Sequence, residues 1–282
     1  MERIRILTDS TADVPADVAH RLGIAVVPAY VQMSGQSLRD GEQITRIEFY
    51  RRLAHLREIP TTAVPPAHEF AAAFRSLVAQ ADVAIAVLIS TTLSGMLNAA
   101  RLGSQEVPEL KVHLVDSKQL AMGLGWQVIL AAEAAAEGKD AEEILTLIRQ
   151  VQPRIRILAM LDTMEHLRRS GRVAWARATA AHLLRIKPLI EFCQGEAILV
   201  GQARTRRNAK QRLLEMTAGL GPLERLAVIH TAAPDVESFR ARLGDLFPVE
   251  HILVSEIGPV VGTHIGPRAL GIAAIVAAQE HR

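Results

Sequence analysis

Short apolar runs rich in β-branched residues alternate with longer amphipathic segments through the first half of the chain. The short runs have the length of buried strands, and the longer segments repeat their apolar residues with a helical period. The predicted strands are Ile4 to Leu7, Ala25 to Val31, Val83 to Ile89 and Val112 to Val115. The predicted helices are Ala16 to Leu22, Arg46 to His55, Ala67 to Ala79, Asn98 to Glu106 and Leu124 to Glu137. This alternation favours a parallel sheet with helices on both faces.

The pattern changes near Pro153, which follows a further predicted helix that ends at about Val151. We therefore predict two domains, residues 1–153 and 154–282. Strands are predicted in the second half at Ile155 to Leu161, Leu189 to Phe192, Ala197 to Val200, Leu226 to His230 and His251 to Glu256. Gln194-Gly195-Glu196 is typical of a hairpin turn, which indicates a mixed sheet. The apolar run Ala269 to Ala278 is predicted as a helix.

Composition narrows the class of protein. A chain of 282 residues with 49% hydrophobic residues can bury a large core. A net charge of +2 and 4% aromatic residues argue against nucleic-acid binding. No run of eighteen uncharged apolar residues occurs, and charges interrupt the first ten positions, so we expect no stable membrane insertion and a cytoplasmic location. The single Cys193 is expected to be a structural thiol in a reducing compartment.

Four predicted loops at the carboxyl ends of strands are rich in hydroxyl groups: Thr8–Asp13, Pro60–Pro65, Ser90–Gly95 and Val115–Ser117. Ligands of open parallel sheets bind at this edge, where helix N-termini supply unpaired N–H groups. Hydroxyls and amides at such positions can hold a carboxylate or a phosphate. The same residues are also ordinary helix N-caps, and for one loop alone that interpretation is the simpler one.

A glycine-punctuated segment, Ile257 to Pro267, contains His264. A histidine between glycines can approach a ligand closely and can donate a hydrogen bond or a positive charge to an anion. Taken by itself, such a histidine more often has a structural role. No histidine in the chain stands in a metal-binding pattern, so no metal site is predicted.

Several short motifs together resemble the DegV family over the whole chain. They are Thr8-Asp9-Ser10-Thr11-Ala12-Asp13, Asp40-Gly41, the Thr62 loop, Leu93-Ser94-Gly95, Val115-Asp116-Ser117, Leu167 to Arg172, Lys187-Pro188 and Gly262 to Pro267. The resemblance implies two α/β lobes, a three-layer N-terminal one with a parallel sheet and a C-terminal one with a mixed sheet, and a lipid tunnel between them. It further implies a long-chain fatty acid as ligand, no cofactor, and a separate ATP-dependent fatty acid kinase subunit as partner, in the service of phospholipid synthesis.

Site residues follow from the same resemblance. Thr62 and Ser94 resemble the hydroxyls that bind the fatty-acid carboxylate, and His264 resembles the histidine near that headgroup. Possible further contacts with the headgroup or an acyl phosphate are Ser10, Gly95, Arg204 and Arg268. Arg172, in the basic segment Arg168 to Arg172, is either part of a solvated helix end or a docking contact for the kinase subunit.

The sequence departs from the family pattern at two places. Thr62-Ala63-Val64-Pro65 stands where the family usually has Thr-Ser-Gln-Pro, which removes two polar side chains at the mouth of the predicted site. Gly266-Pro267-Arg268 replaces the usual Gly-Pro-Gly. Arg268 can pair with an anionic headgroup, or it can point to solvent and change docking.

Two enzymatic alternatives remain open from the sequence. An acyl hydrolase would use Ser94 as nucleophile and His264 as its base, although the Gly-x-Ser-x-Gly elbow is missing. A kinase acting by itself is suggested by fold-level similarity to dihydroxyacetone-kinase-like proteins, although the chain has no Gly-x-x-x-x-Gly-Lys-Ser/Thr loop. We therefore expect a carrier protein and not an enzyme.

Overall fold

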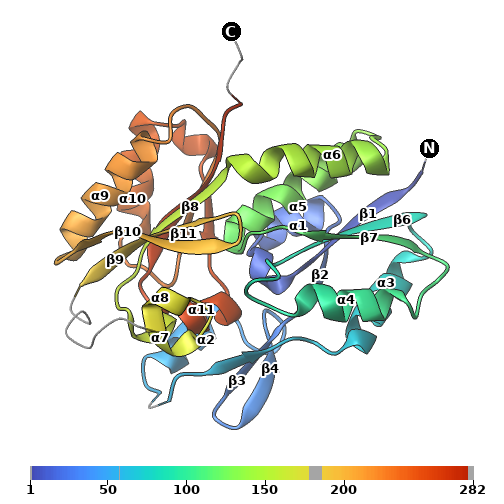
Figure 1. The fold of residues 1–282 in the computed structure, drawn as a ribbon, viewed down its shortest axis with the longest axis horizontal. Helices are drawn as coiled ribbons and strands as arrows, with labels where there is room; N and C mark the ends of the chain where they lie inside the picture. Colours follow the sequence, from blue (N-terminus) through green and yellow to red (C-terminus); the bar gives the residue numbers. More distant parts are fainter. Residues whose placement is uncertain (1, 57, 178–185, 279–282) are drawn as a thin grey trace.

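A parallel sheet and a mixed sheet form the two halves of the molecule (Figure 1). The computed structural model describes residues 2–56, 58–177 and 186–278. The first half contains a four-stranded parallel sheet in the order β2-β1-β6-β7. Its strands are β1 (Ile4–Asp9), β2 (Ala25–Val27), β6 (Val83–Leu88) and β7 (Lys111–Asp116). Every residue of β6 is buried, as expected for a central strand with helices on both faces.

Helices cover both faces of this parallel sheet, with α3 and α4 on one side and α5 and α6 on the other (Figure 1). The helices of the first half are α1 (Ala16–Arg21), α2 (Arg46–Leu53), α3 (Ala67–Leu77), α4 (Met96–Ser104), α5 (Ala121–Ala136) and α6 (Ala141–Val151), with short 3-10 turns η1 (Ser10–Ala12) and η2 (Gln152–Arg154). The predicted three-layer arrangement of this half is confirmed.

The first half also contains a small antiparallel sheet in the order β4-β3-β5, which was not predicted. Its strands are β3 (Tyr30–Met33), β4 (Gln36–Arg39) and β5 (Thr61–Ala63). The prediction of one strand from Ala25 to Val31 is wrong, because the chain leaves the parallel sheet after Val27 and enters this small sheet at Tyr30. Pro28 lies between the two strands and has no N–H to donate to a ladder. The small sheet carries Thr62 on β5.

The second half contains a six-stranded mixed sheet in the order β10-β9-β8-β13-β11-β12. Its strands are β8 (Ile155–Met160), β9 (Lys187–Cys193), β10 (Glu196–Ala203), β11 (Leu223–His230), β12 (Leu253–Glu256) and β13 (Leu270–Val276). Its helices are α7 (Glu165–Ser170), α8 (Ala174–Arg177), α9 (Arg206–Ala218), α10 (Val236–Arg242) and α11 (Pro259–Ile265), with 3-10 turns η4 (Leu243–Asp245) and η5 (Val249–His251). Only β11 and β12 are parallel neighbours, so the predicted mixed sheet is confirmed.

The hairpin at Gln194-Gly195 is confirmed: both residues have positive φ, 51° and 84°, as a tight hairpin turn requires. The helix predicted from Ala269 to Ala278 is wrong, because Leu270 to Val276 form β13 in the interior of the sheet. A strand buried on both faces is apolar at every position, and such a run does not show the strand period of two. The helix of this region is α11, which begins earlier at Pro259.

Helix α5 packs between the two sheets and joins the halves. It contacts β1 and β6 on one side and β8, β11 and β13 on the other, and nearly all its residues are buried. The indole Nε1–H of Trp126 donates to the carbonyl of Ala273 on β13, 2.9 Å away. The largest buried apolar cluster therefore runs through both halves, and the domain division at residue 153 stays a prediction. None of the helices in the described part of the chain has the length and apolar character to cross a membrane.

Candidate functional site

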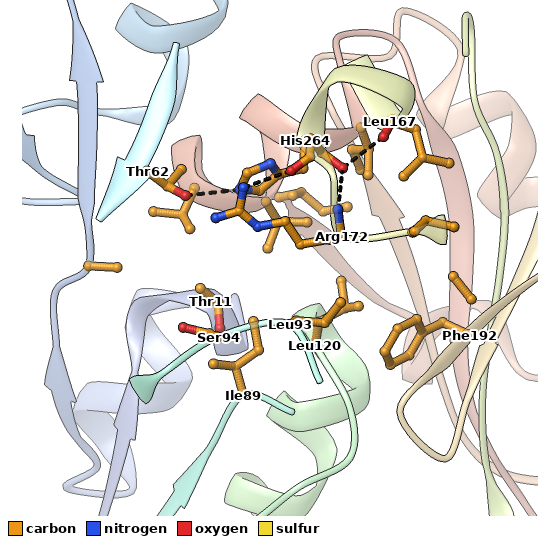
Figure 2. Close-up of a pocket in the computed structure, with 18 of the residues that line it drawn as sticks. Thr11, Thr62, Ile89, Leu93, Ser94, Leu120, Leu167, Arg172, Phe192 and His264 are labelled. Atoms are coloured by element: carbon orange, nitrogen blue, oxygen red, sulfur yellow. Dashed lines mark hydrogen bonds between the residues drawn. The ribbon is translucent and has the colours of Figure 1, made fainter. Parts of the chain in front are cut away.

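An apolar cavity of about 240 Å³ lies between the two halves (Figure 2). The first half contributes Ile89, Leu93 and Leu120, and the second half contributes Ile157 and Phe192. These side chains come from the carboxyl ends of parallel strands and from the facing surface of the mixed sheet. The cavity thus has the apolar wall that a hydrocarbon ligand needs.

Thr62 and His264 form a polar pair at one side of this cavity (Figure 2). Thr62 Oγ1 and His264 Nε2 are 2.9 Å apart and share a hydrogen bond. β5 supplies the threonine and α11 supplies the histidine, so the bond joins the small sheet to the second half. The structure brings together two residues that the family resemblance predicted to bind one headgroup.

The neighbours of α11 fix the position of His264. Nδ1–H of His166, on α7, donates to the carbonyl of Thr263 at 3.1 Å. Gly266 ends the helix with φ 79°, and a Cβ there would lie 2.6 Å from the His166 ring. Only glycine fits this close approach without a shift of the ring. The end of α11 that carries His264 is therefore held against α7.

Burial and nearby positive charge keep His264 neutral. Burial, then the guanidinium of Arg172 and the ring of His166, lower the pKa of His264 from 6.5 to about 4. Figure 2 shows the Arg172 guanidinium beside the His264 ring. At neutral pH the imidazole therefore offers one donor and one acceptor, while Arg172 supplies the positive charge. An anion bound between them would raise the pKa of His264 again.

Arg172 reaches the cavity because Gly171 reverses the chain at the end of α7. Gly171 has φ 70°, the left-handed conformation common after a helix. The guanidinium then donates from Nη1 to the carbonyl of Ser170 at 2.8 Å. The sequence predicted Arg172 as part of a solvated helix end or as a docking contact, and its place beside His264 was missed. The Ser170-Gly171 pair was the local signal for this reversal.

Ser94 and Thr11 line the cavity on the side facing Thr62 (Figure 2). Within the described residues the Ser94 hydroxyl has no hydrogen-bond partner, so it can donate to a ligand. Gly95, which was predicted as a possible headgroup contact, also lines the cavity and is the N-cap of α4. Thr11 donates from its hydroxyl to Asp9 Oδ1 at 2.5 Å. Thr11 was not predicted as a site residue.

Most other hydroxyls of the four loops serve the fold itself. Thr8 donates to the carbonyl of Val87, and Thr91 donates to Asp116. Ser117 bonds both the N–H and the carbonyl of Gln119. The hydroxyls of these residues therefore act as local capping and bridging groups within the fold.

Three predicted headgroup residues lie away from the cavity lining. The Ser10 hydroxyl donates to Asp40 Oδ2 and accepts from the N–H of Ala29. Arg204 is exposed between β10 and α9. Arg268 is exposed in the turn before β13, and its carbonyl accepts from Arg206 Nη1. The structure does not bring these three side chains to Thr62 and His264.

A second pocket of about 210 Å³, which is more polar than the first, adjoins it at His264 and Arg172. Its lining includes Arg169, His166 and Glu58. The pair Thr62 and His264 therefore stands between an apolar cavity and a polar pocket rich in basic groups. Such an arrangement suits a ligand with an apolar body and an anionic end.

The geometry gives no support to a Ser94–His264 nucleophile pair. The imidazole Nε2 bonds Thr62, and no hydrogen bond between Ser94 and His264 occurs in the described part of the chain. No acidic side chain among the described residues bonds the ring of His264. The described residues also contain no group of three His, Cys, Asp or Glu that could hold a metal ion.

Comparisons with known proteins agree on one family. Residues 3–277 match the family model described as "Uncharacterised protein, DegV family". A DegV domain-containing protein of Streptomyces coelicolor is 35% identical over 275 residues, which are 95% of this chain and 97% of that protein. One of Caldanaerobacter subterraneus is 30% identical over 276 residues, covering 96% and 98%.

Solved structures with the same fold include proteins described as binding fatty acids. A fatty-acid-binding DegV family protein from Thermus thermophilus superposes with a TM-score of 0.88 and 33% identity, covering 98% of this chain and all of that one. DegV of Bacillus subtilis, described as a fatty acid binding protein, has a TM-score of 0.87 and 28% identity with the same coverage.

Proposed function

Because the chain belongs to the DegV family, we propose that it binds a long-chain fatty acid in the cavity between its two halves. The observation that carries this proposal is an apolar cavity with the Thr62–His264 pair and Arg172 at one side. The fatty-acid-binding relatives with 33% and 28% identity support it.

The hydrocarbon tail supplies the affinity in this proposal. Each buried methylene contributes roughly 0.8 kcal/mol, so a chain of about a dozen gives about 10 kcal/mol before the costs of association. The walls near Leu120 and Phe192 receive the tail. The headgroup contacts then decide which end of the acid lies at Thr62.

The carboxylate lies between the two polar sides of the cavity. Ser94 donates a hydroxyl hydrogen bond to the carboxylate. The neutral ring of His264 donates from Nε2–H to Thr62 Oγ1, which leaves the hydroxyl hydrogen of Thr62 for the carboxylate. Arg172 supplies the countercharge that a buried carboxylate requires, since an unpaired charge in an apolar cavity is strongly unfavourable. Ala63 and Val64, which line the same side, add apolar contacts where the family pattern has polar residues.

Presentation of the acid to a separate ATP-dependent kinase follows as the second part of the proposal. The polar pocket beside His264 leads from the predicted headgroup to the surface, and Arg169 and Arg172 line it. A carboxylate oxygen would attack the γ-phosphorus of ATP there, and ADP would leave. Because ATP is the phosphoryl donor, this proposal places the protein in the cytoplasm and makes it a carrier.

Native mass spectrometry of the purified protein tests the binding proposal. We expect a stoichiometric long-chain fatty acid that organic extraction releases. Thr62→Ala/Ser94→Ala should retain much less of it. Thr61→Ala is the matched control, because Thr61 lies on the same strand, is exposed and does not line the cavity. A protein that stays free of lipid after incubation with fatty acids would refute the proposal.

The kinase step has its own experiment. The fatty-acid-loaded protein is incubated with ATP, with and without a purified fatty acid kinase subunit, and acyl phosphate is trapped as a hydroxamate. We expect product only with the kinase subunit. Arg172→Ala should lower this yield, either by loss of docking or by loss of the countercharge. The fatty-acid content of the Arg172→Ala variant distinguishes these two causes. Loss of a docking contact leaves the content unchanged, whereas loss of the countercharge lowers it.

Product formed by the carrier with ATP alone would instead establish the kinase alternative. Ester hydrolysis that disappears in Ser94→Ala would establish the hydrolase alternative.

A further inference from the structure

Two buried carboxylates and one guanidinium lie where the first half meets α11. Asp13 and Asp40 are 2% and 6% exposed, and Arg46 Nη2 lies 3.4 Å from Asp13 Oδ1. Asp13 closes the hydroxyl-rich loop after β1, Asp40 follows β4, and Arg46 opens α2. We refer to Asp13, Asp40 and Arg46 as the carboxylate cluster. None of the three lines the cavity in which the ligand is proposed to bind.

The carboxylate cluster holds the beginning of α11. The N–H of Gly258 donates to Asp13 Oδ1 at 2.7 Å, and the N–H of Val260 donates to Asp40. The Ser255 hydroxyl donates to the carbonyl of Asp13 at 2.5 Å. A Cβ on Gly258 would lie 3.0 Å from Asp13 Oδ1 and 3.2 Å from both oxygens of Asp40. The two carboxylates therefore flank the same backbone turn.

Tyr50 adds a neutral contact to the same segment. Its buried hydroxyl donates to the carbonyl of Ile257 at 2.7 Å. At the opposite end of α11, His264 bonds Thr62. The first half thus holds the short helix at both ends. The position of His264 depends on the hydrogen bonds that Gly258 and Val260 donate to the two carboxylates.

The charges in the carboxylate cluster do not balance when both acids are ionised. Two carboxylates face one guanidinium, and Asp13 Oδ2 and Arg46 Nε are buried without a hydrogen-bond partner among the described residues. One proton on the two acids balances the charges of these three residues, and the nearby carboxyls of Asp9 and Glu256 add further negative charge. A buried excess charge is unfavourable, so the closed arrangement favours the singly protonated state.

We propose that Asp13 and Asp40 hold one proton between them in the closed protein, and that loss of this proton loosens α11 and moves His264 away from Thr62. Asp13 and Asp40 are positioning residues in this scheme and do not touch the ligand. The consequence for ligand release rests on the proposed function, whereas the effect on α11 itself does not.

The acidities of the cluster are consistent with this geometry. Burial raises the pKa of Asp13 to about 7 and that of Asp40 to about 6. Asp9 on β1, Tyr50 on α2, Glu256 on β12 and His230 on β11 are the other titratable groups of these electrostatic surroundings. An acid whose folded pKa is raised stabilises the folded form at low pH, and this contribution is lost as pH rises from about 4 to about 7. Opening of α11 is therefore favoured on the alkaline side.

Amide hydrogen exchange of the ligand-free protein tests the grip on α11. Protection of residues 258–265, corrected for intrinsic exchange, is measured at about pH 5.5 and about pH 8. We expect protection to fall at the higher pH by about tenfold for each unit by which the pKa in the closed protein exceeds 5.5. Asp13→Asn and Asp40→Asn, which each remove one ionisable carboxyl, should abolish this fall. Asp17→Asn on the exposed face of α1 is the control and should keep it.

Release of bound fatty acid provides the second readout. The wild-type rate should rise over the same pH range, and both Asn variants should show a flat profile. If Asp13→Asn fails to fold, Asp40→Asn gives the same comparison. An unchanged pH dependence of exchange in the variant that folds would overturn the proposal. The exchange experiment uses no ligand. It therefore still tests the effect of the carboxylate cluster on α11 if the protein turns out not to bind fatty acid.

Discussion

Thr62 and His264 are 202 positions apart in the chain, yet a hydrogen bond of 2.9 Å joins Thr62 Oγ1 to His264 Nε2. β5 of the small sheet carries one partner and α11 carries the other. The bond closes the polar side of a cavity that neither half forms alone. Changes to α11 are therefore expected to alter both stability and the ligand site.

The pH dependence of stability gives a first prediction for His264. Its pKa is lowered from 6.5 to about 4, so the unfolded chain binds the proton more readily and stability falls as pH drops from 6.5 to 4. The loss amounts to about 3 kcal/mol at the acid end of this range. His264→Gln should flatten this part of the profile in chemical denaturation of the ligand-free protein. The exposed His20→Gln should not, and an equal slope in both variants would contradict the assignment.

The chain length of the ligand gives a second prediction. Phe192 lines the cavity on the side away from Thr62 (Figure 2) and is 5% exposed. Phe192→Leu removes aromatic volume from the wall, so longer acyl chains should fit better. Mass analysis of the lipids extracted after expression should show this shift. Phe74→Leu is the control, since Phe74 is fully buried on α3 away from the cavity and should cost stability without changing the lipid profile.

The local sequence pattern predicted where the helices and strands lie better than it predicted whether a given segment is a helix or a strand. The alternation around Val83 to Ile89 correctly placed a buried parallel strand, because its flanking helices and its length left little ambiguity. Leu270 to Val276 failed for the opposite reason, since a run that is apolar at every position is compatible with either a strand or a buried helix. Pairing with β8 and β11 decides between them, and that pairing is tertiary information.

The candidate site needed information that no local pattern contains. The family resemblance identified Thr62, Ser94 and His264 as site residues, but the cavity that they share is visible only in the folded chain. Arg172 was predicted for a different role, since its place beside His264 follows from the left-handed turn at Gly171. The hydrogen bond from the N–H of Gly258 to Asp13 Oδ1 was not predicted, since 245 positions separate the two residues.

Arg268 gives a third prediction, on backbone strain. It has φ 64°, where the family pattern has glycine, and a side chain with a Cβ is unfavourable in this conformation. Arg268→Gly should therefore raise the free energy of unfolding by about 1 kcal/mol, reduced somewhat by the greater freedom of glycine in the unfolded chain. Arg268→Ala keeps the Cβ and should bring no such gain. Equal stability of the two variants in urea unfolding would show that the turn is not strained.

The contact of Trp126 with Ala273 gives the last prediction, on how the halves are held together. Trp126 is 3% exposed on α5, and its Nε1–H donates to a carbonyl of the mixed sheet at 2.9 Å. Trp126→Phe keeps most of the apolar contact but removes the donor, so the free energy of unfolding should fall by about 1–3 kcal/mol.

Urea unfolding measures this loss, and two optical probes should still report one common transition, because the largest apolar cluster includes residues of both halves. Two separated transitions in the wild-type protein would instead mean that the predicted domains 1–153 and 154–282 unfold independently. In that case the effect of Trp126→Phe should appear in the stability of the interface and not in the midpoint of either transition.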